Sequence, residues 1–179
     1  MSFFSDIYSS DYYEAAAQFH VNPDNCENPQ HYDDYLKYNA LIDMKKGLAV
    51  TYIFCEKNDE TEDIKIMGFV SLKASSLVVD EGEKIKCGYP AVEIAELAVS
   101  QEYERNGKGT EFVEFALAKA CELSTSIGIK YLVLCADPSA VQFYQNENLK
   151  FIQLDGQYQG QIPRERWNMT CVPMAKKIV

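Results

Sequence analysis

The spacing of apolar and aromatic residues is helical in the first part of the chain. Residues 9–20 contain a serine cap followed by good helix formers, which predict a short first helix. Asn28 followed by Pro29 is typical of an N-cap with proline at the first helical position, and the helical spacing continues to about Lys46. Gly47 then predicts the end of this second helix.

β-branched and aromatic runs follow, with the spacing of strands. Residues 48–56 and 64–74 predict two strands that are antiparallel, because only a short acidic loop separates them. Residues 91–99 predict another strand, which leads into a turn with two glycines and then a long amphipathic helix. Between these strands, residues 75–90 predict only an exposed turn at 80–84.

A strand–helix–strand unit begins at this turn. The long helix carries an apolar stripe and is expected to end at Gly128. Residues 129–136 form an almost uninterrupted apolar run, typical of a strand that is buried on both faces in a parallel pair. This order of elements predicts a right-handed βαβ crossover. The stripe comprises Phe112, Phe115, Ala116, Leu117, Ala120 and Leu123.

The end of the chain predicts a short helix and two further strands. Asp137 is placed to cap this helix. Asn148 is expected in the left-handed terminating position, followed by Leu149 as the hydrophobic closer. The predicted strands cover residues 149–155 and 166–178, with a loop between them.

Composition and charge narrow the class of protein. A chain of 179 residues has the size of one compact domain. Its net charge of -10 disfavours a diffuse nucleic-acid surface. No apolar run is long enough to span a bilayer and the first residues lack a signal-peptide pattern, so we expect a cytoplasmic protein. The six cysteines show no paired spacing and only two histidines accompany them, which predicts free, mostly buried thiols and no metal site.

The turn with two glycines carries the first chemical signal. In ELAVSQEYERNGKGT, residues 96–110, a strand runs into a turn that contains Gly107 and Gly109 at the start of a helix. Such a turn gathers backbone N–H groups and the positive end of a helix dipole, and it therefore predicts an anion site. Neither a nucleotide P-loop nor a Rossmann turn fits, since the upstream glycines of those motifs are absent.

The short-helix segment DPSAVQFYQNENLKF, residues 137–151, carries the second signal. The two segments, in this order and at this separation, resemble the GNAT superfamily of acyl-CoA N-acyltransferases, and the match covers residues 48–176. The resemblance implies an α/β (α+β) fold with a mixed central sheet of about six to seven strands, helices on both faces, and a splay between the fourth and fifth strands. It also implies one N-acetyltransferase domain over residues 1–179, in which residues 1–47 form a helical segment on the acceptor side.

The resemblance implies acetyl-CoA as cosubstrate. The main-chain edge of the fourth strand would pair with the pantetheine arm, and the N–H groups of the glycine turn would hold the pyrophosphate, with positive charge from Arg105 and Lys108. Glu104 departs from the family pattern, which usually has Gln or Arg at this position. The implied coenzyme-binding residues are Leu97, Ala98, Val99, Arg105, Asn106, Gly107, Lys108, Gly109, Thr110, Asp137, Ser139 and Phe143.

The resemblance also implies direct transfer of the acetyl group to a primary amine. Tyr144 would protonate the departing thiolate, a role that suits its phenol. Glu93 and Glu96 are alternative bases, which strand alternation puts on opposite faces, and Glu93 is slightly preferred. A surface salt bridge is an equally good interpretation of either glutamate. His20 and His31 lie outside the matched region and are expected to be ordinary polar surface groups.

The N-terminal part has a narrower resemblance to GNAT toxins of toxin–antitoxin systems, which acetylate aminoacyl-tRNA. The acidic charge of the chain, including Asp33 and Asp34, disfavours a tRNA substrate, and the same segment suits a small-amine pocket lined by tyrosines. A catalytically silent acyl-CoA-binding module is the rival from another class, and a homodimer is compatible with the sequence. The toxin-like positions are Cys26, Tyr35, Leu36, Gly47, Leu48 and Ala49, and the pocket tyrosines are Tyr32, Tyr35 and Tyr38.

Overall fold

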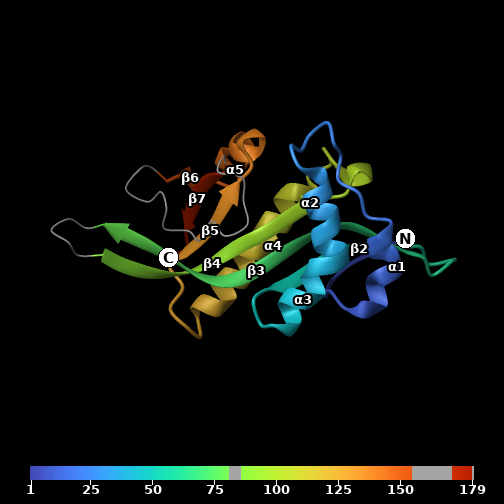
Figure 1. Ribbon diagram of the computed structural model, residues 1–179, viewed down its shortest axis with the longest axis horizontal. Coiled ribbons are helices and arrows are strands. Elements are labelled where there is room, and N and C mark those ends of the chain that lie inside the picture. The colour runs from blue at the N-terminus through green and yellow to red at the C-terminus, as the bar shows by residue number, and fades with distance from the viewer. Residues whose placement is uncertain (81–85, 155–170, 179) are drawn as a thin grey trace. The chain divides into compact units, whose positions relative to one another are not determined.

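The computed structural model describes residues 1–80, 86–154 and 171–178 (Figure 1). The strands are β1 (Ser2–Ile7), β2 (Val50–Lys57), β3 (Ile64–Asp80), β4 (Lys86–Val99), β5 (Tyr131–Ala136), β6 (Ile152–Gln153) and β7 (Val172–Lys177). The α-helices are α1 (Tyr13–Ala17), α2 (Pro29–Asp34), α3 (Ala40–Lys45), α4 (Lys108–Ser124) and α5 (Val141–Gln145). Short 3-10 turns precede α1, α4 and α5, and a π turn joins α2 to α3.

The strands form a mixed sheet in the order β1-β2-β3-β4-β5-β7-β6. β4 and β5 pair in parallel, whereas β1–β2, β2–β3, β5–β7 and β6–β7 are antiparallel pairs. The mixed α/β fold predicted from the sequence is therefore confirmed. The chain divides into two compact units, unit 1 with Met1–Leu72 and Ala95–Val113, and unit 2 with Lys73–Ile94 and Glu114–Val179. β3, β4 and α4 each contribute residues to both units.

The predicted N-terminal helices form in unit 1, with changes in detail. Ser9 caps the first helical turn, where its hydroxyl accepts a hydrogen bond from the N–H of Asp11 at 3.3 Å. The second predicted helix starts at Pro29 as expected, but the π turn Tyr35–Asn39 interrupts it. Gly47 follows α3 with a φ of 67°, the left-handed conformation that ends helices and that glycine adopts without strain.

Helical segments cover both faces of the strands in unit 1. Ile53 of β2 and Phe69 of β3 are cross-strand partners, and Tyr35 stacks on Phe69 with ring centroids 5.9 Å apart. Phe54, the next residue along β2, points to the opposite face because successive side chains alternate. There Phe112 of α4 stacks on it at 3.9 Å. The prediction of helices on both faces is confirmed for this unit.

β1 is a strand that the sequence pattern does not predict. Most of its side chains are exposed, Phe3 and Ile7 among them, so the run lacks the alternation of a half-buried strand. Its backbone pairs with β2 along its whole length, from Ser2 opposite Lys57 to Ile7 opposite Tyr52. Pairing with a neighbouring strand, and not burial, therefore determines its conformation.

Unit 2 contains the predicted parallel pair. β4 and β5 pair from Ala91 opposite Tyr131 to Ile94 opposite Leu134. The ladder ends there, although β4 and β5 both continue, which confirms the predicted splay between the fourth and fifth strands. The core of unit 2 comprises Leu77, Ala91, Val133, Leu154 and Ala175.

Of residues 75–90, which the sequence leaves largely unassigned, the described parts 75–80 and 86–90 belong to two strands. β3 continues to Asp80 and β4 begins at Lys86. The turn predicted at 80–84 lies, beyond Asp80, outside the described residues, as does the loop predicted before the last strand. That last strand is described from residue 171 onward and is β7.

The predicted end of the long helix is wrong by four residues. α4 ends at Ser124, before Gly128, and Leu123 at the end of the predicted stripe is exposed. The N–H groups of Ser126 and Ile127 both donate to the carbonyl of Leu123, at 3.0 and 2.9 Å. These turn hydrogen bonds satisfy the helix end, so no left-handed glycine is needed.

The predicted left-handed Asn148 is also wrong. The side-chain oxygen of Asn146 accepts hydrogen bonds from the N–H groups of Asn148 and Leu149, at 2.8 and 3.0 Å, and closes α5. The positive φ of this segment falls on Lys150, at 53°. Leu149 is buried, as expected of the hydrophobic closer.

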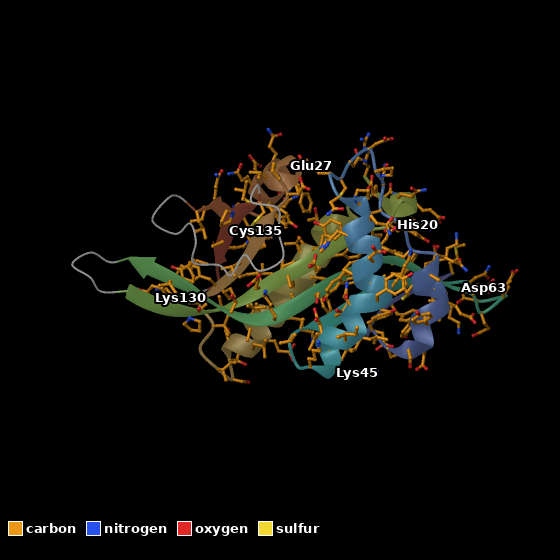
Figure 2. The ribbon with its side chains drawn as sticks, viewed as in Figure 1. His20, Glu27, Lys45, Asp63, Lys130 and Cys135 are labelled. Carbon is orange, nitrogen blue, oxygen red and sulfur yellow. A yellow bond between two sulfur atoms is a disulfide. The ribbon has the colours of Figure 1, made fainter. Side chains whose placement is uncertain are left out.

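The sequence predicts that the cysteines are free, and for two of them this prediction is wrong. Cys135 and Cys171 form a disulfide, with an S–S distance of 2.04 Å; Cys135 is labelled in Figure 2. The pairing of β5 with β7 sets Cys135 opposite Pro173, two residues from Cys171, and so joins cysteines that are 36 residues apart. Of the free cysteines, Cys55 is buried as predicted, whereas Cys121 is exposed.

Candidate active site

The glycine turn that precedes α4 lies in unit 1. After a 3-10 turn at Gln101–Tyr103, Arg105 and Gly107 adopt left-handed conformations, with φ values of 60° and 78°. α4 begins at Lys108, and the first N–H groups of a helix have no acceptor within it. A change of backbone handedness next to a helix start directs successive N–H groups toward one concavity. This backbone is suited to a phosphate group.

Glu104, the departure from the family pattern, is held by the loop before α2. Its carboxylate accepts hydrogen bonds from the side-chain amides of Asn25 at 2.5 Å and Asn22 at 3.2 Å. Arg105 Nη2 donates to the amide oxygen of the same Asn25 at 3.3 Å. The negative charge of Glu104 is therefore engaged by two amide donors, and the guanidinium of Arg105 is anchored next to it.

Lys108, the second cation of the turn, is paired within its own helix. Its Nζ lies 2.8 and 3.1 Å from the two carboxylate oxygens of Glu111, and 5.6 Å from the centroid of the Phe3 ring. An exposed pair of this kind contributes little stability. Lys108 can therefore exchange Glu111 for a phosphate at small cost.

The end of β4 presents main-chain groups on two edges. The N–H of Ser100 donates to the carbonyl of Met67 at 2.8 Å, and the carbonyl of Ala98 faces β3 as well. Backbone groups of successive residues alternate between the two edges of a strand. Leu97 and Val99 therefore direct their N–H and C=O groups toward the edge away from β3, where an extended chain could add to the strand.

Tyr144 lies in an apolar part of unit 2. It is buried on α5, and its ring meets those of Phe143 and Phe151 edge to face, with centroids 4.9 and 5.7 Å apart. Burial raises the pKa of its phenol above the ordinary value of tyrosine, because the phenolate would lose its hydration. Tyr144 therefore keeps its proton over the neutral pH range, which is the state that a proton donor needs.

The entry to α5 has the cap that the sequence predicts. Asp137 Oδ1 accepts hydrogen bonds from the N–H of Ser139 at 3.0 Å and from its hydroxyl at 2.8 Å. The main-chain N–H of Phe151 donates to the carbonyl of Tyr144 at 3.0 Å and holds the other end of the helix. Both contacts fix the position of the Tyr144 side chain within unit 2.

Glu93 and Glu96 are both buried, with 5% and 4% of their surface exposed. The salt bridge that the sequence leaves open does form at Glu93, with Lys73, but both carboxylates are buried and not at the surface. In unit 2, the carboxylate of Glu93 lies 3.1 Å from the Lys73 ammonium and accepts a hydrogen bond from the Ser75 hydroxyl at 2.9 Å. A buried carboxylate needs such partners to offset the loss of hydration.

In unit 1, Glu96 has a histidine as its partner. His31 Nε2 lies 3.0 Å from Glu96 Oε2, and 24% of the imidazole side chain is exposed. The prediction that His31 is an ordinary surface group is wrong. Sequence reasoning missed it because the two residues are 65 positions apart, on α2 and β4, and no local motif links them.

His20, the other histidine, is 59% exposed and lies 2.8 Å from Asp33 Oδ2 (Figure 2). Asp33 is buried and also accepts a hydrogen bond from the N–H of Val21 at 2.9 Å. Among the described residues, no group of three acidic, histidine or cysteine side chains could hold a metal ion. No helix of the described ranges is sufficiently long and apolar to cross a membrane.

The chain is similar to known acetyltransferases. A family model described as the acetyltransferase (GNAT) family matches residues 4–150. No curated protein matches the chain. Among solved structures, a mutant of the toxin AtaT has a TM-score of 0.76 and 18% identity, over 98% of this chain and 89% of its own. AtaTR bound with acetyl-CoA has a TM-score of 0.74 and 18% identity, over 98% and 94% of the two chains.

AtaT complexed with acetyl-methionyl-tRNAfMet is similar too, with a TM-score of 0.72 and 19% identity, over 96% of this chain and 94% of that one. At such low identity these likenesses establish the fold and not the substrate. The family match runs from β1 to the end of α5, so it includes the glycine turn, both buried glutamates and Tyr144. The chain accordingly belongs to the GNAT family of acetyltransferases, which are acetyl-CoA-dependent N-acyltransferases.

Proposed function

We propose that this protein transfers the acetyl group of acetyl-CoA to a primary amine by direct attack in a ternary complex. The observation that carries the proposal is the left-handed backbone at Arg105 and Gly107 directly before α4, since this geometry suits the pyrophosphate of the coenzyme. A catalytic domain formed by the whole chain, with residues 1–47 on the acceptor side, is part of the proposal.

The proposed coenzyme contacts follow the chain from β4 to α5. The N–H groups of the turn from Arg105 to Thr110 hold the pyrophosphate, with Arg105 and Lys108 nearby as cations. The outward main-chain groups of Leu97 and Val99, with Ala98 between them, pair with the pantetheine arm as with an added strand. The coenzyme-side residues proposed for α5 and its cap are Asp137, Ser139 and Phe143.

The proposed chemistry needs one acid and one base. Tyr144 protonates the thiolate of departing CoA; its position on α5 and its protonated phenol at neutral pH support this role. The amine must lose a proton before it attacks, and Glu93 and Glu96 are the candidate bases on β4. Burial of both carboxylates supports a role in the interior of the site.

A second candidate function is acetylation of aminoacyl-tRNA. Support comes from the likeness to AtaT, a protein seen with acetyl-methionyl-tRNAfMet, and from the toxin-like N-terminal segment. The net charge of -10 opposes it, because phosphate contacts need Lys and Arg. The burial of Asp33 removes one of the two acidic side chains that oppose tRNA on α2, but Asp34 remains.

Turnover and growth measurements test both candidates. We expect purified protein to release the CoA thiol from acetyl-CoA in the presence of spermidine, methionine methyl ester or total aminoacylated tRNA. Release with tRNA alone, together with growth arrest on expression, would favour the second candidate. Tight acetyl-CoA binding without thiol release on any of these amines would instead support an acyl-CoA-binding module.

The coenzyme site itself is tested at a glycine. Gly107→Ala should weaken acetyl-CoA binding by about tenfold, because a φ of 78° costs an L residue roughly 1–2 kcal/mol and displaces the turn. Gly128→Ala is the matched control, since Gly128 has open space around it and no positive φ. Equal calorimetric affinities of the two variants would contradict the proposed pyrophosphate site.

A further inference from the structure

Glu96 is a buried carboxylate whose partner can change its charge. A carboxylate with 4% exposure is costly unless a donor stabilises it, and His31 Nε2 provides that donor at 3.0 Å. With Glu96 ionised, the proton of a neutral imidazole belongs on Nε2, so the lone pair lies on Nδ1. A buried carboxylate that orients an imidazole in this way makes it a better proton acceptor and stabilises the imidazolium that results.

His31 has the exposure that a proton carrier needs. It lies in the first turn of α2, and about a quarter of its side chain is in contact with solvent, whereas Glu96 is closed off. Two of the titratable groups that face this pair are Tyr32, whose ring lies 5.2 Å from the imidazole, and Tyr35, whose pKa is raised by burial and in part by the charge of Glu96.

Glu93, the alternative base, is placed differently. Its carboxylate already lies against the fixed positive charge of Lys73 and accepts the Ser75 hydroxyl. The positive charge of Lys73 at 3.1 Å already balances the carboxylate of Glu93. Taking a proton from an amine would leave Lys73 without its counter-charge.

The position of Glu96 along β4 connects the pair to the acyl donor. Glu96 directly precedes Leu97, and successive residues of a strand rise by about 3.3 Å. Leu97 and Val99 carry the outward main-chain groups assigned above to the pantetheine arm. Within unit 1, the His31–Glu96 pair therefore adjoins the strand segment along which the thioester would lie.

We propose that His31 is the general base of the acetyl transfer and that Glu96 is the residue that positions it; the proposal rests on the proposed function. Nδ1 of His31 takes a proton from the ammonium form of the acceptor. The freed lone pair attacks the carbonyl carbon of acetyl-CoA, the C–N bond forms, and the C–S bond breaks. The CoA thiolate takes its proton from Tyr144, and the second proton of the new amide nitrogen passes by way of solvent to the Tyr144 phenolate. The imidazolium returns its proton to solvent, so that one proton is released in each cycle.

The pH profile of a His31→Gln variant tests the proposal, with CoA-thiol release from acetyl-CoA and the amines named above as the assay. We expect kcat to fall by about 100-fold, within the range of a general base, and the acidic limb of the kcat/KM profile to disappear. The affinity for acetyl-CoA should stay within about twofold. His20→Gln is the matched control, because His20 also pairs with a buried carboxylate and has no assigned role.

Chemical rescue separates catalysis from folding. Added imidazole should restore part of the activity of His31→Ala, which a purely structural role of His31 would not allow. Wild-type kcat and an unchanged acidic limb in His31→Gln, or no rescue of a folded His31→Ala that binds acetyl-CoA, would overturn the proposal while the proposed function stands. Wild-type protein that binds acetyl-CoA but releases no thiol with any of the amines would overturn both.

Discussion

Tyr144 in unit 2 and His31 in unit 1 lie in opposite surroundings. Tyr144 is enclosed by aromatic rings, so its anion is disfavoured and the phenol keeps its proton. His31 instead faces the buried carboxylate of Glu96 at 3.0 Å, and part of its imidazole is exposed to solvent. Such different surroundings are compatible with the roles proposed above, with Tyr144 as the acid and His31 as the base. The comparison teaches that partners, and not residue type alone, decide the direction of proton transfer.

Removing the acid should have the largest effect. Tyr144→Phe should lower kcat by about 1,000-fold, because a positioned proton donor contributes a factor of roughly 100 to 10,000, with little change in acetyl-CoA affinity. Steady-state kinetics and calorimetry measure the two quantities. Tyr8→Phe is the matched control, since Tyr8 is also a fully buried tyrosine but lies in unit 1. Unchanged turnover in Tyr144→Phe would remove Tyr144 from the mechanism.

Substitution of the two buried glutamates should have the next largest effect, and the two variants should differ from each other. Glu96→Gln should lower kcat by roughly 30-fold, because the imidazole loses the charge that orients it. Glu93→Gln should reduce kcat less and lower the melting temperature more, since Lys73 then loses its partner. The measurement is kcat and thermal unfolding on both variants. A larger loss of kcat in Glu93→Gln would reverse the assignment of the base.

A substitution at Gly68, where β3 packs closely against α4 and β4, should have a smaller effect. A Cβ at Gly68 would lie 2.2 Å from the Phe112 ring and 2.5 Å from the Ala98 carbonyl. Gly68→Ala should therefore destabilise the protein by about 2 kcal/mol. Gly88→Ala is the control, because nothing lies within 4 Å of its Cβ position. Urea unfolding measures both, and equal midpoints would show that β3 and β4 can move apart at Gly68.

The smallest expected effect is on the pH dependence of folding stability, through Tyr8, which has no proposed catalytic role. The hydroxyl of Tyr8 is buried and, among the described residues, has no hydrogen-bond partner, and burial raises its pKa to about 12. Above the ordinary tyrosine pKa of about 10 the unfolded chain loses this proton while the folded protein keeps it, so Tyr8 lowers the stability of the fold as the pH rises from about 10 toward 12. Tyr8→Phe should raise stability by about 1 kcal/mol at neutral pH and reduce the alkaline loss.

Thermal unfolding at pH 7 and pH 10.5 measures this change. A lower melting temperature of Tyr8→Phe at neutral pH would show that the hydroxyl has a partner. If Tyr8→Phe and Tyr144→Phe reduced kcat alike, buried tyrosines would matter here only for packing, and the contrast between acid and base would fail.

Much of the fold follows from short-range patterns. The glycine turn, the capped start of α5 and the apolar strand β5 each depend on residues that are close in sequence. Their detection needs only period, caps and turn residues. Where two nearby residues could each end a helix, the sequence predicts the end less accurately. Asn146 and a turn at Leu123 ended α5 and α4 in place of the expected Asn148 and Gly128.

The sequence by itself determined the family, the turn before α4 and the tyrosine of α5, because each of these is a local motif with its own physical cause. Only the tertiary structure decided the partners of the buried charges. His31 and Glu96, like Cys135 and Cys171, are distant in sequence and meet through strand and helix packing. The periodicity of the sequence does not predict such contacts, because they depend on how whole elements are placed in each unit. The proposed acid could therefore be identified from the sequence, whereas the proposed base could not.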